Sequence, residues 1–235
     1  MGIAYGVTTN FQATKGIVQD GLVFNIDAAV KQSYNNGTTC QDLTLGNVGT
    51  LTNMDSSNFS KTNGGSLSFD GSNERIVYSN CPEYDFADAN FTACCIFRST
   101  QVQNYRGFCG KIQFGNGTSG WTLQLHSGKI RSWIADQYLD SPSNYNDGEW
   151  HYACAVHEEP STGTRYIYVD GQLVATGLMP NHGYTFSNVD MWVGGWGSTS
   201  YMFNGEIASL NLYNRALTAA EVSRNFNVMR HRFGI

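Results

Sequence analysis

The stretch "TRYIYVDGQLVATG", residues 164–177, is the clearest fold signal in the chain. Apolar residues alternate with less apolar ones on both sides of Asp170-Gly171. Asp-Gly tolerates the positive φ angles that a two-residue hairpin turn requires. The pattern therefore predicts two antiparallel strands joined by a tight turn.

Similar short runs of alternating apolar residues lie before and after this hairpin, and short turn signals separate them. Residues 120–136 contain a second hairpin signal at Ser127-Gly128. Residues 65–79 read as one strand that is broken by a turn at Asp70-Gly71. Further strand patterns occupy residues 21–28, 91–99, 107–114, 149–157, 189–195 and 205–213. About a dozen short strands at such intervals predict an antiparallel β-sandwich.

One segment near the end follows a helical period instead. In "LTAAEVSRNFNVMRHRF", residues 217–233, Thr218 and Glu221 form the capping-box pattern of a helix start. Val222, Phe226 and Met229 recur at the spacing of one helix face. We expect a short helix that packs against the sandwich through these three residues, although a tail that binds a partner would carry the same stripe.

Length and composition limit both the domain organisation and the class of partner. A chain of 235 residues fits one all-β domain, which we place at residues 21–235, after an arm or edge segment of residues 1–20. Charged residues make up 14% and the net charge is −5. A protein that binds nucleic acid needs a basic face. No membrane-length apolar run and no signal peptide are visible, so nucleic acid and membrane are not expected partners.

The six cysteines do not follow a metal-binding pattern. They stand at positions 40, 81, 94, 95, 109 and 154, and no C-x-x-C pair occurs among them. Cys94 and Cys95 are adjacent in a strand pattern, so their side chains should point to opposite faces. We expect all six to be small buried hydrophobes with free thiols, in a protein made in a reducing compartment.

Six segments of the chain, taken in order, carry a family likeness. They read GLVFNIDAA, GGSLSFDGSNERIVY, FTACCIF, DGEWHYACAV, YIYVDGQLV and FNGEIASLNLYNRALTAAEVSRNF. The set resembles the laminin-G-like branch of the concanavalin A-like lectin/glucanase superfamily, from Gly21 to the end of the chain. The resemblance implies an all-β fold: a concanavalin A-like (laminin-G-like) antiparallel β-sandwich, or jelly roll, with one short C-terminal helix.

A second likeness points to viral particles. The start "MGIAYGV", the phrase "GLVFNIDAA" and the ending "NRALTAAEVSRNFNVMRHRFGI" resemble structural proteins of tailed bacteriophages, cyanophages in particular. This implies a virion component assembled in the host cytoplasm, such as a capsid decoration protein or a fibre-type surface module. Its expected partners are other virion proteins and further copies of the chain in a symmetric assembly.

An acidic stretch raises the possibility of catalysis. "EYDFAD", residues 83–88, brings together Glu83, Asp85 and Asp88, and related glucanases carry a similar acidic cluster on one strand. Here Pro82 precedes the cluster, and proline cannot donate a hydrogen bond in a central strand. We therefore expect a solvated loop, anchored by Tyr84 and Phe86, and a protein that is not an enzyme.

Two kinds of binding site remain as hypotheses. Laminin-G-like domains often hold a calcium ion at the rim of the sandwich, and the resemblance implies Asp27 and Asp70 as the positions for such a site. Relatives often carry an acidic residue where this chain has Ala208, which weakens that implication. Asp70 could instead shape its turn with Gly71.

The second hypothesis is a glycan site. Trp196, Tyr201, Tyr138 and Tyr145 lie in loop-like stretches that are rich in small polar residues. Aromatic rings with a few polar groups suit the binding of a sugar. The same rings could also anchor loops to the core or pack against a neighbouring subunit.

Three functions are therefore compared. We favour a non-enzymatic virion structural protein with a lectin-like sandwich that aids attachment to glycans of the host surface. A free lectin-type adhesin is the alternative, and a β-glucanase-like glycoside hydrolase is the third possibility.

Overall fold

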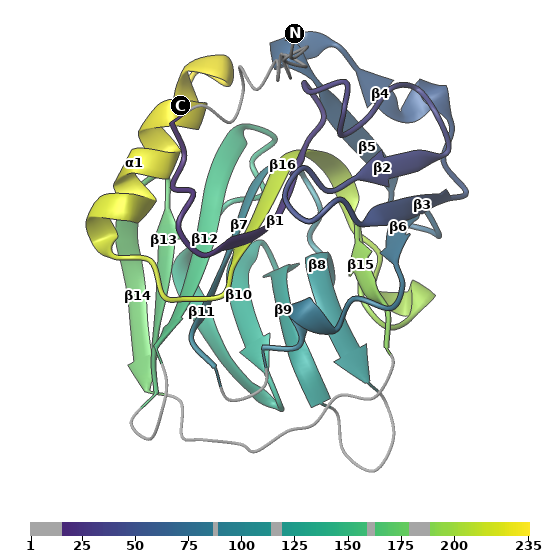
Figure 1. Ribbon diagram of the computed structural model, residues 1–235. Helices are drawn as coiled ribbons and strands as arrows, with labels where there is room; N and C mark the ends of the chain where they lie inside the picture. Colours follow the sequence, from purple (N-terminus) through teal and green to yellow (C-terminus); the bar gives the residue numbers. More distant parts are fainter. Residues whose placement is uncertain (1–15, 87–88, 114–118, 159–162, 179–188) are drawn as a thin grey trace, which may run out of the picture.

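The computed structural model describes residues 16–86, 89–113, 119–158, 163–178 and 189–235. Two antiparallel sheets lie face to face, and one helix covers the outer face of the first (Figure 1). The predicted β-sandwich with a short C-terminal helix is confirmed.

The first sheet has the order β14–β13–β12–β7–β16–β5–β4, and β1 also pairs with β16. Its members are β1 (Leu22–Asp27), β4 (Phe59–Ser60), β5 (Ser66–Asp70), β7 (Phe91–Arg98), β12 (Trp150–Glu158), β13 (Thr164–Val169), β14 (Gln172–Leu178) and β16 (Asn204–Tyr213).

The second sheet has the order β11–β10–β9–β8–β15–β6–β3–β2. Its members are β2 (Thr39–Gln41), β3 (Val48–Thr52), β6 (Arg75–Tyr78), β8 (Arg106–Gln113), β9 (Ser119–His126), β10 (Lys129–Ile134), β11 (Gln137–Asn144) and β15 (Met191–Val193). Short 3₁₀ turns join several strands: η1 (Ser56–Asn58), η2 (Thr62–Gly64), η3 (Pro82–Tyr84) and η4 (Thr199–Tyr201).

The core fills the space between the two sheets. Alternate residues of each strand point inward, as the pleat of a β-strand requires. Phe97 of the first sheet and Phe108 of the second meet with ring centroids 4.3 Å apart, and both are fully buried. Burial of many such side chains provides the main driving force for the fold.

Both predicted hairpins are confirmed. The φ angles are 51° and 82° at Ser127 and Gly128, and 49° and 76° at Asp170 and Gly171. Positive φ at both central residues identifies the turn type that matches the twist of a β-hairpin. Gly171 is also needed for space, because a Cβ atom there would lie 2.6 Å from the ring of Phe226.

Two strand assignments made from the sequence are wrong. Residues 65–79 are not one broken strand, because β5 belongs to the first sheet and β6 to the second. The Asp70 carboxylate accepts hydrogen bonds from the backbone N–H groups of Ser72 (2.7 Å) and Asn73 (3.4 Å), and this turn carries the chain from one sheet to the other.

The second error concerns residues 137–144, which read as a loop but form β11. The strand contains Pro142, which lacks a backbone N–H. A proline is tolerated there because β11 is at the edge of its sheet and pairs only with β10 among the described residues.

The predicted helix is confirmed as α1 (Ala219–Met229), which continues into η5 (Arg230–Arg232). The Thr218 hydroxyl accepts from the Glu221 backbone N–H (3.3 Å), and the Glu221 carboxylate accepts from the Thr218 N–H (2.9 Å). Val222, Phe226 and Met229 are buried on the first sheet. No helix in the described part of the chain is both long and apolar enough to span a membrane.

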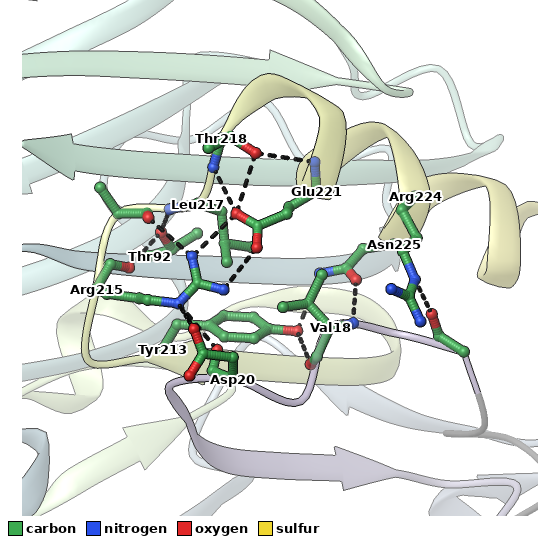
Figure 2. A network of polar contacts seen from close by, with 12 residues as sticks. Val18, Asp20, Thr92, Tyr213, Arg215, Leu217, Thr218, Glu221, Arg224 and Asn225 are labelled. Atoms are coloured by element: carbon green, nitrogen blue, oxygen red, sulfur yellow. Dashed lines mark hydrogen bonds and ion pairs between the residues drawn. The ribbon is translucent and has the colours of Figure 1, made fainter.

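The segment before β1 is tied to the helix and to β16 (Figure 2). The Val18 backbone N–H donates to Asn225 Oδ1 (2.8 Å), and the Tyr213 hydroxyl donates to the Val18 carbonyl (3.1 Å). Arg215 pairs with both Asp20 (2.9 Å) and Glu221 (2.6 Å). Residues 16–20 therefore lie against the sandwich, and residues 1–15 of the predicted arm lie outside the described residues.

All six cysteines are buried and free. Cys94 packs with the helix on the outer face of the first sheet, whereas Cys95 lies in the core between the sheets. The expected burial and the opposite orientation of the two neighbours are confirmed. Burial raises the pKa of Cys40 and of Cys81 to about 11, which keeps these thiols protonated near neutral pH.

Candidate functional site

The outer face of the second sheet carries a row of side chains that crosses its strands. Met191, Val193, Cys109, Trp121 and Ile134 point into the core, so the residues next to them point outward. Successive cross-strand pairs then define a single row from β3 to β11. This row, called the aromatic row below, consists of Thr50, Val77, Trp192, Gly110, Thr122, Trp133 and Tyr138.

The two residues at the middle of the aromatic row are small and buried. Gly110 and Thr122 are paired neighbours that lie between Trp192 on β15 and Trp133 on β10. A Cβ atom at Gly110 would lie 2.8 Å from the Thr122 Cβ atom, so glycine is required beside the threonine. Three strand spacings, about 14 Å, separate the backbones that carry the two tryptophans. Both tryptophans are half-buried.

Trp196 and Tyr201 form one border of this floor. Their rings stack with centroids 4.0 Å apart and 6° between planes. Trp196 also lies nearly parallel to Trp133, with centroids 6.5 Å apart, and its indole N–H donates to Gln124 Oε1 (3.1 Å). A Cβ atom at Gly107 would lie 2.3 Å from the Trp196 ring, so this glycine makes room for it.

Trp196 lies beneath the surface of this face, because only 7% of the residue is exposed. Tyr201, stacked upon it, is half-buried and belongs to the same loop. Of these predicted glycan residues, Tyr201 is therefore the one that can present a ring to a ligand, and Trp196 holds it in place.

Tyr138 ends the row at the edge strand β11. It is 59% exposed, and the Arg131 guanidinium lies over its ring, 3.8 Å from the centroid. Arg131 is held in turn by the Asp140 carboxylate through bonds of 2.6 Å and 2.8 Å. This bidentate pair neutralises the arginine and fixes the tyrosine ring beside the row.

Tyr145 lies away from the other three predicted glycan residues. It follows β11, packs on the core between the sheets, and approaches the His151 ring at 5.2 Å. Its backbone N–H donates to the Gly128 carbonyl (2.7 Å). The structure thus brings Trp196, Tyr201 and Tyr138 onto one face and gives Tyr145 an anchoring position.

Trp133 and Trp192 are the site residues that sequence reasoning missed. Both lie in short strand patterns, KIRSWI and MWV, between residues that point into the core. A large aromatic residue at an outward position of a strand is the signal that could have identified them, because that position usually holds a polar side chain.

The charges around the row are few and largely balanced. Arg75 places its guanidinium 4.5 Å from the centre of the Trp192 ring, so one cation borders the row. His126 lies at the end of β9, and burial, followed by the nearby charge of Arg131, lowers its pKa. This histidine is therefore neutral at pH 7, and the floor between the tryptophans carries no charged side chain.

The sequence matches a known family over most of its length. The profile of the laminin-G-like group described as the concanavalin A-like lectin/glucanases superfamily matches residues 70–223. The chain belongs to this superfamily.

Solved structures agree with this superfamily in fold. A Trypanosoma rangeli sialidase in complex with sialic acid matches with a TM-score of 0.63 and 19% identity, over 88% of this chain and 32% of the sialidase. Domain 4 of a GH43 extracellular arabinanase from Geobacillus stearothermophilus, in complex with arabinotriose, matches with a TM-score of 0.62 and 16% identity. The match covers 86% of this chain and 96% of that domain. The binding domain of botulinum neurotoxin serotype G matches with a TM-score of 0.63 and 17% identity, over 88% of this chain and 51% of the toxin domain.

One curated protein matches by sequence as well. Human pentraxin-4 is 32% identical over 85 residues, which are 33% of this chain and 18% of the pentraxin. The chain thus corresponds to a minor part of that relative, and to about a third of the sialidase.

The acidic cluster of this lectin/glucanase-type domain is structural where it is described. Glu83 accepts a hydrogen bond from the Asn47 side chain, and Asp85 pairs with the buried Lys111. Tyr84 and Phe86 are buried as predicted, and the Tyr84 carbonyl accepts from the Trp121 indole (2.9 Å). Asp88 lies outside the described residues. The segment is a loop with a short 3₁₀ turn that leads into β7, as expected.

The two aspartates proposed for calcium have separate roles. Asp27 is buried, pairs with Arg232 (2.7 Å) and accepts from the Ala29 N–H (2.9 Å). Asp70 shapes its turn. The described residues include no group of three or more His, Cys, Asp or Glu side chains that could hold a metal ion. Arg232 already neutralises the Asp27 carboxylate, and the Asp70 carboxylate is bound within its own turn, so this pair does not supply the six to eight oxygen ligands that Ca²⁺ takes.

Proposed function

We propose that this protein is a non-enzymatic carbohydrate-binding module and that the glycan lies along the aromatic row. The observation that carries the proposal is the pair of half-buried tryptophans, Trp133 and Trp192, on either side of a floor made by Gly110 and Thr122. Sugar rings have apolar C–H faces that pack on aromatic rings, and such sites add a few polar groups for orientation.

Polar groups are available beside those rings. The Thr122 hydroxyl donates to the Cys109 carbonyl (3.0 Å) and is almost fully buried, so it shapes the floor and does not contact a ligand. Arg75 borders Trp192 and can donate to a sugar hydroxyl or ring oxygen. The exposed Tyr138 and the half-buried Tyr201 add phenol groups at two borders of the face. An apolar surface with these groups at its edge suits a flexible, hydroxyl-rich ligand.

The absence of catalysis is proposed on chemical grounds. Most glycosidases use two carboxyl groups on opposite sides of the scissile bond. Asp140 lies beside Tyr138 at the end of the row, and both of its oxygens are bound to Arg131. No described member of the row is acidic. Glu83 and Asp85 are engaged with Asn47 and Lys111.

We further propose that this module is part of a virion, as a capsid decoration or fibre-type surface protein that aids attachment to host glycans. The likeness of the chain start and of the C-terminal segment to tailed-phage structural proteins supports this role. The six free cysteines suit assembly in a reducing cytoplasm. A free lectin-type adhesin would have the same binding face and would differ only in where it is found.

The binding proposal is tested with a glycan array, followed by calorimetric titration of the best ligand. Trp133→Ala should weaken binding by more than tenfold, since a stacked aromatic residue is a typical hot spot. Trp196→Ala should also weaken binding, because Tyr201 loses the ring on which it stacks. Tyr166→Ala, a half-buried aromatic on the first sheet, serves as the matched control and should bind normally.

Three results would contradict parts of this proposal. Wild-type affinity in Trp133→Ala would exclude the aromatic row as the site. Release of reducing ends from β-glucans, abolished by Glu83→Gln, would establish a hydrolase. Absence of the chain from purified virions would remove the structural role and leave the adhesin.

A further inference from the structure

Tyr105, in the connection between β7 and β8, has an unusual backbone conformation. Its φ angle is 60°. In the described part of the chain, the other non-glycine residues with positive φ are asparagine, aspartate, serine or alanine. A bulky residue is rare in this region, because its Cβ atom comes too close to the neighbouring backbone. Strained conformations of this kind are concentrated at active sites, ligand-binding sites and switch regions, so Tyr105 is a candidate for a role in binding.

The connection that carries Tyr105 is fixed to the turn between β9 and β10. The Tyr105 N–H donates to His126 Nδ1 (3.3 Å), and the two rings meet edge to face with centroids 4.5 Å apart. The Ser127 N–H donates to the Gln103 carbonyl (3.3 Å), and the Ser127 hydroxyl donates to Asn104 Oδ1. Because several contacts hold this segment together, the strained conformation persists.

The Tyr105 ring gains little from burial in return for this strain. It is 40% exposed, and it belongs to neither of the core clusters that the described residues form. A buried ring would remove its apolar surface from water and so offset the cost of the backbone conformation. Core packing therefore does not account for the conformation of Tyr105.

The ring lies beside two borders of the proposed glycan-binding face. It meets Tyr201 edge to face, with centroids 6.0 Å apart and 80° between the planes. The Arg131 guanidinium is 5.7 Å from the centre of the Tyr105 ring and 3.8 Å from the centre of the Tyr138 ring. Tyr105 is thus connected with both tyrosines that border the face, with Tyr201 directly and with Tyr138 through Arg131.

Tyr105 extends the face along the strands of the second sheet. Thr122, Gln124 and His126 are alternate residues of β9 and share its outward side. Thr122 belongs to the aromatic row, whereas Tyr105 lies against His126, about 13 Å further along the strand. Trp196, which is bound to Gln124, lies between these two levels.

We infer that Tyr105 is a further glycan-contacting residue, which binds a sugar unit beyond the aromatic row. The inference rests on the proposed function of that row. The exposed ring offers an apolar face to the C–H groups of a sugar, and its phenol group can donate to and accept from sugar hydroxyls. A ring that is already held in place loses little conformational freedom when a ligand binds. The ligand class is therefore an oligosaccharide that reaches from Trp133 to Tyr105, and not a single sugar.

The test compares the best glycan from the array with fragments that are shorter by one sugar unit, in titrations of the full chain. Tyr105→Asn removes the ring, and asparagine tolerates the positive φ. Its affinity for the complete glycan should fall about fivefold. The fragment that lacks the unit at Tyr105 should bind the variant and the wild type equally well, because it does not reach the ring.

Two further variants separate ligand contact from structural support. Tyr105→Phe keeps the ring and should keep most of the affinity. Val102→Asn replaces an exposed apolar residue of the same connection and should bind like the wild type. Because asparagine relieves the strain, the midpoint of urea unfolding should not fall in Tyr105→Asn.

The outcomes separate this inference from the function on which it rests. Wild-type affinity in Tyr105→Asn, together with weak binding in Trp133→Ala, would overturn the inference and leave the proposed function intact. Wild-type affinity in both variants would overturn the proposed function itself. An equal loss for the complete glycan and every fragment, or a lowered urea midpoint in Tyr105→Asn, would show that the ring supports the face without touching the ligand, and would overturn the inference as well.

Discussion

The two sheets share one core but differ completely on their outer faces. Outward positions of the first sheet are apolar, including Cys94, Ile96, Tyr152 and Cys154, and α1 covers them. Outward positions of the second sheet combine tryptophan, glycine, threonine and arginine, and no helix formed by the described residues lies over them (Figure 1). The difference shows that a covering helix stabilises one face of this sandwich, whereas the other is the face that we propose for glycan binding.

The first prediction disturbs the covered face and should have the largest effect. Phe226 is buried between α1 and the first sheet, next to Tyr152. Phe226→Ala should lower the free energy of unfolding by about 3 kcal/mol, because it removes a large buried ring and leaves a cavity. Urea denaturation measures this loss.

The same variant should expose particular thiols. Cys94 and Cys154 lie beneath the helix, whereas Cys95 and Cys109 lie between the sheets. Alkylation of the native protein should therefore accelerate at the first two positions and stay slow at the others. Equal acceleration at all four would show that the helix does not protect one face selectively.

The second prediction alters the open face. Trp133→Ala removes a half-buried ring from a surface row, so it should lower the free energy of unfolding by about 1 kcal/mol or less. The same change should abolish most of the glycan affinity. Parallel denaturation and titration experiments measure both effects. A loss of stability as large as that of Phe226→Ala would mean that the open face is structural.

The third prediction concerns pH and the cap of the covering helix, and its effect is the smallest. The hydrogen bond and ion pair with Arg215 lower the pKa of Glu221 to about 2. A lowered pKa in the folded state means that the pair stabilises the protein above the normal pKa of a glutamate. This stability is lost as the pH falls from about 4.5 to 2.

Glu221→Gln should therefore flatten the stability profile in this acidic range. Because both partners are partly exposed, the gain is below about 1 kcal/mol. Unfolding curves recorded at a series of pH values compare the variant with the wild type. Identical slopes in the two proteins would show that the pair contributes nothing to helix docking.

Local features of the fold could be read from the sequence because they depend on neighbouring residues. Asp170-Gly171 and Ser127-Gly128 determine their turns by backbone conformation alone. Thr218 and Glu221 define the helix start through bonds within one turn. The assignment of β5 and β6 to different sheets could not be read in this way, because a strand pattern does not reveal its pairing partner.

The candidate site depends on pairing between distant segments. Trp192 meets Gly110 only because β15 pairs with β8, and Gly110 meets Thr122 through the separate pairing of β8 with β9. Trp196 and Tyr201 were predicted for their aromatic character, but the sequence does not show that one supports the other. Tyr145 has the same local composition around it and takes a different role, since its neighbours in space are the core and His151.

The ties that join residues 16–20 to α1 and β16 have a consequence for orientation. Ile17 and Val18 are buried with the helix, at the back of the first sheet, and the aromatic row faces the opposite way. A body bound to residues 16–20 would therefore lie on the face opposite the aromatic row. Trp133 and Trp192 would then remain uncovered on the other side of the molecule.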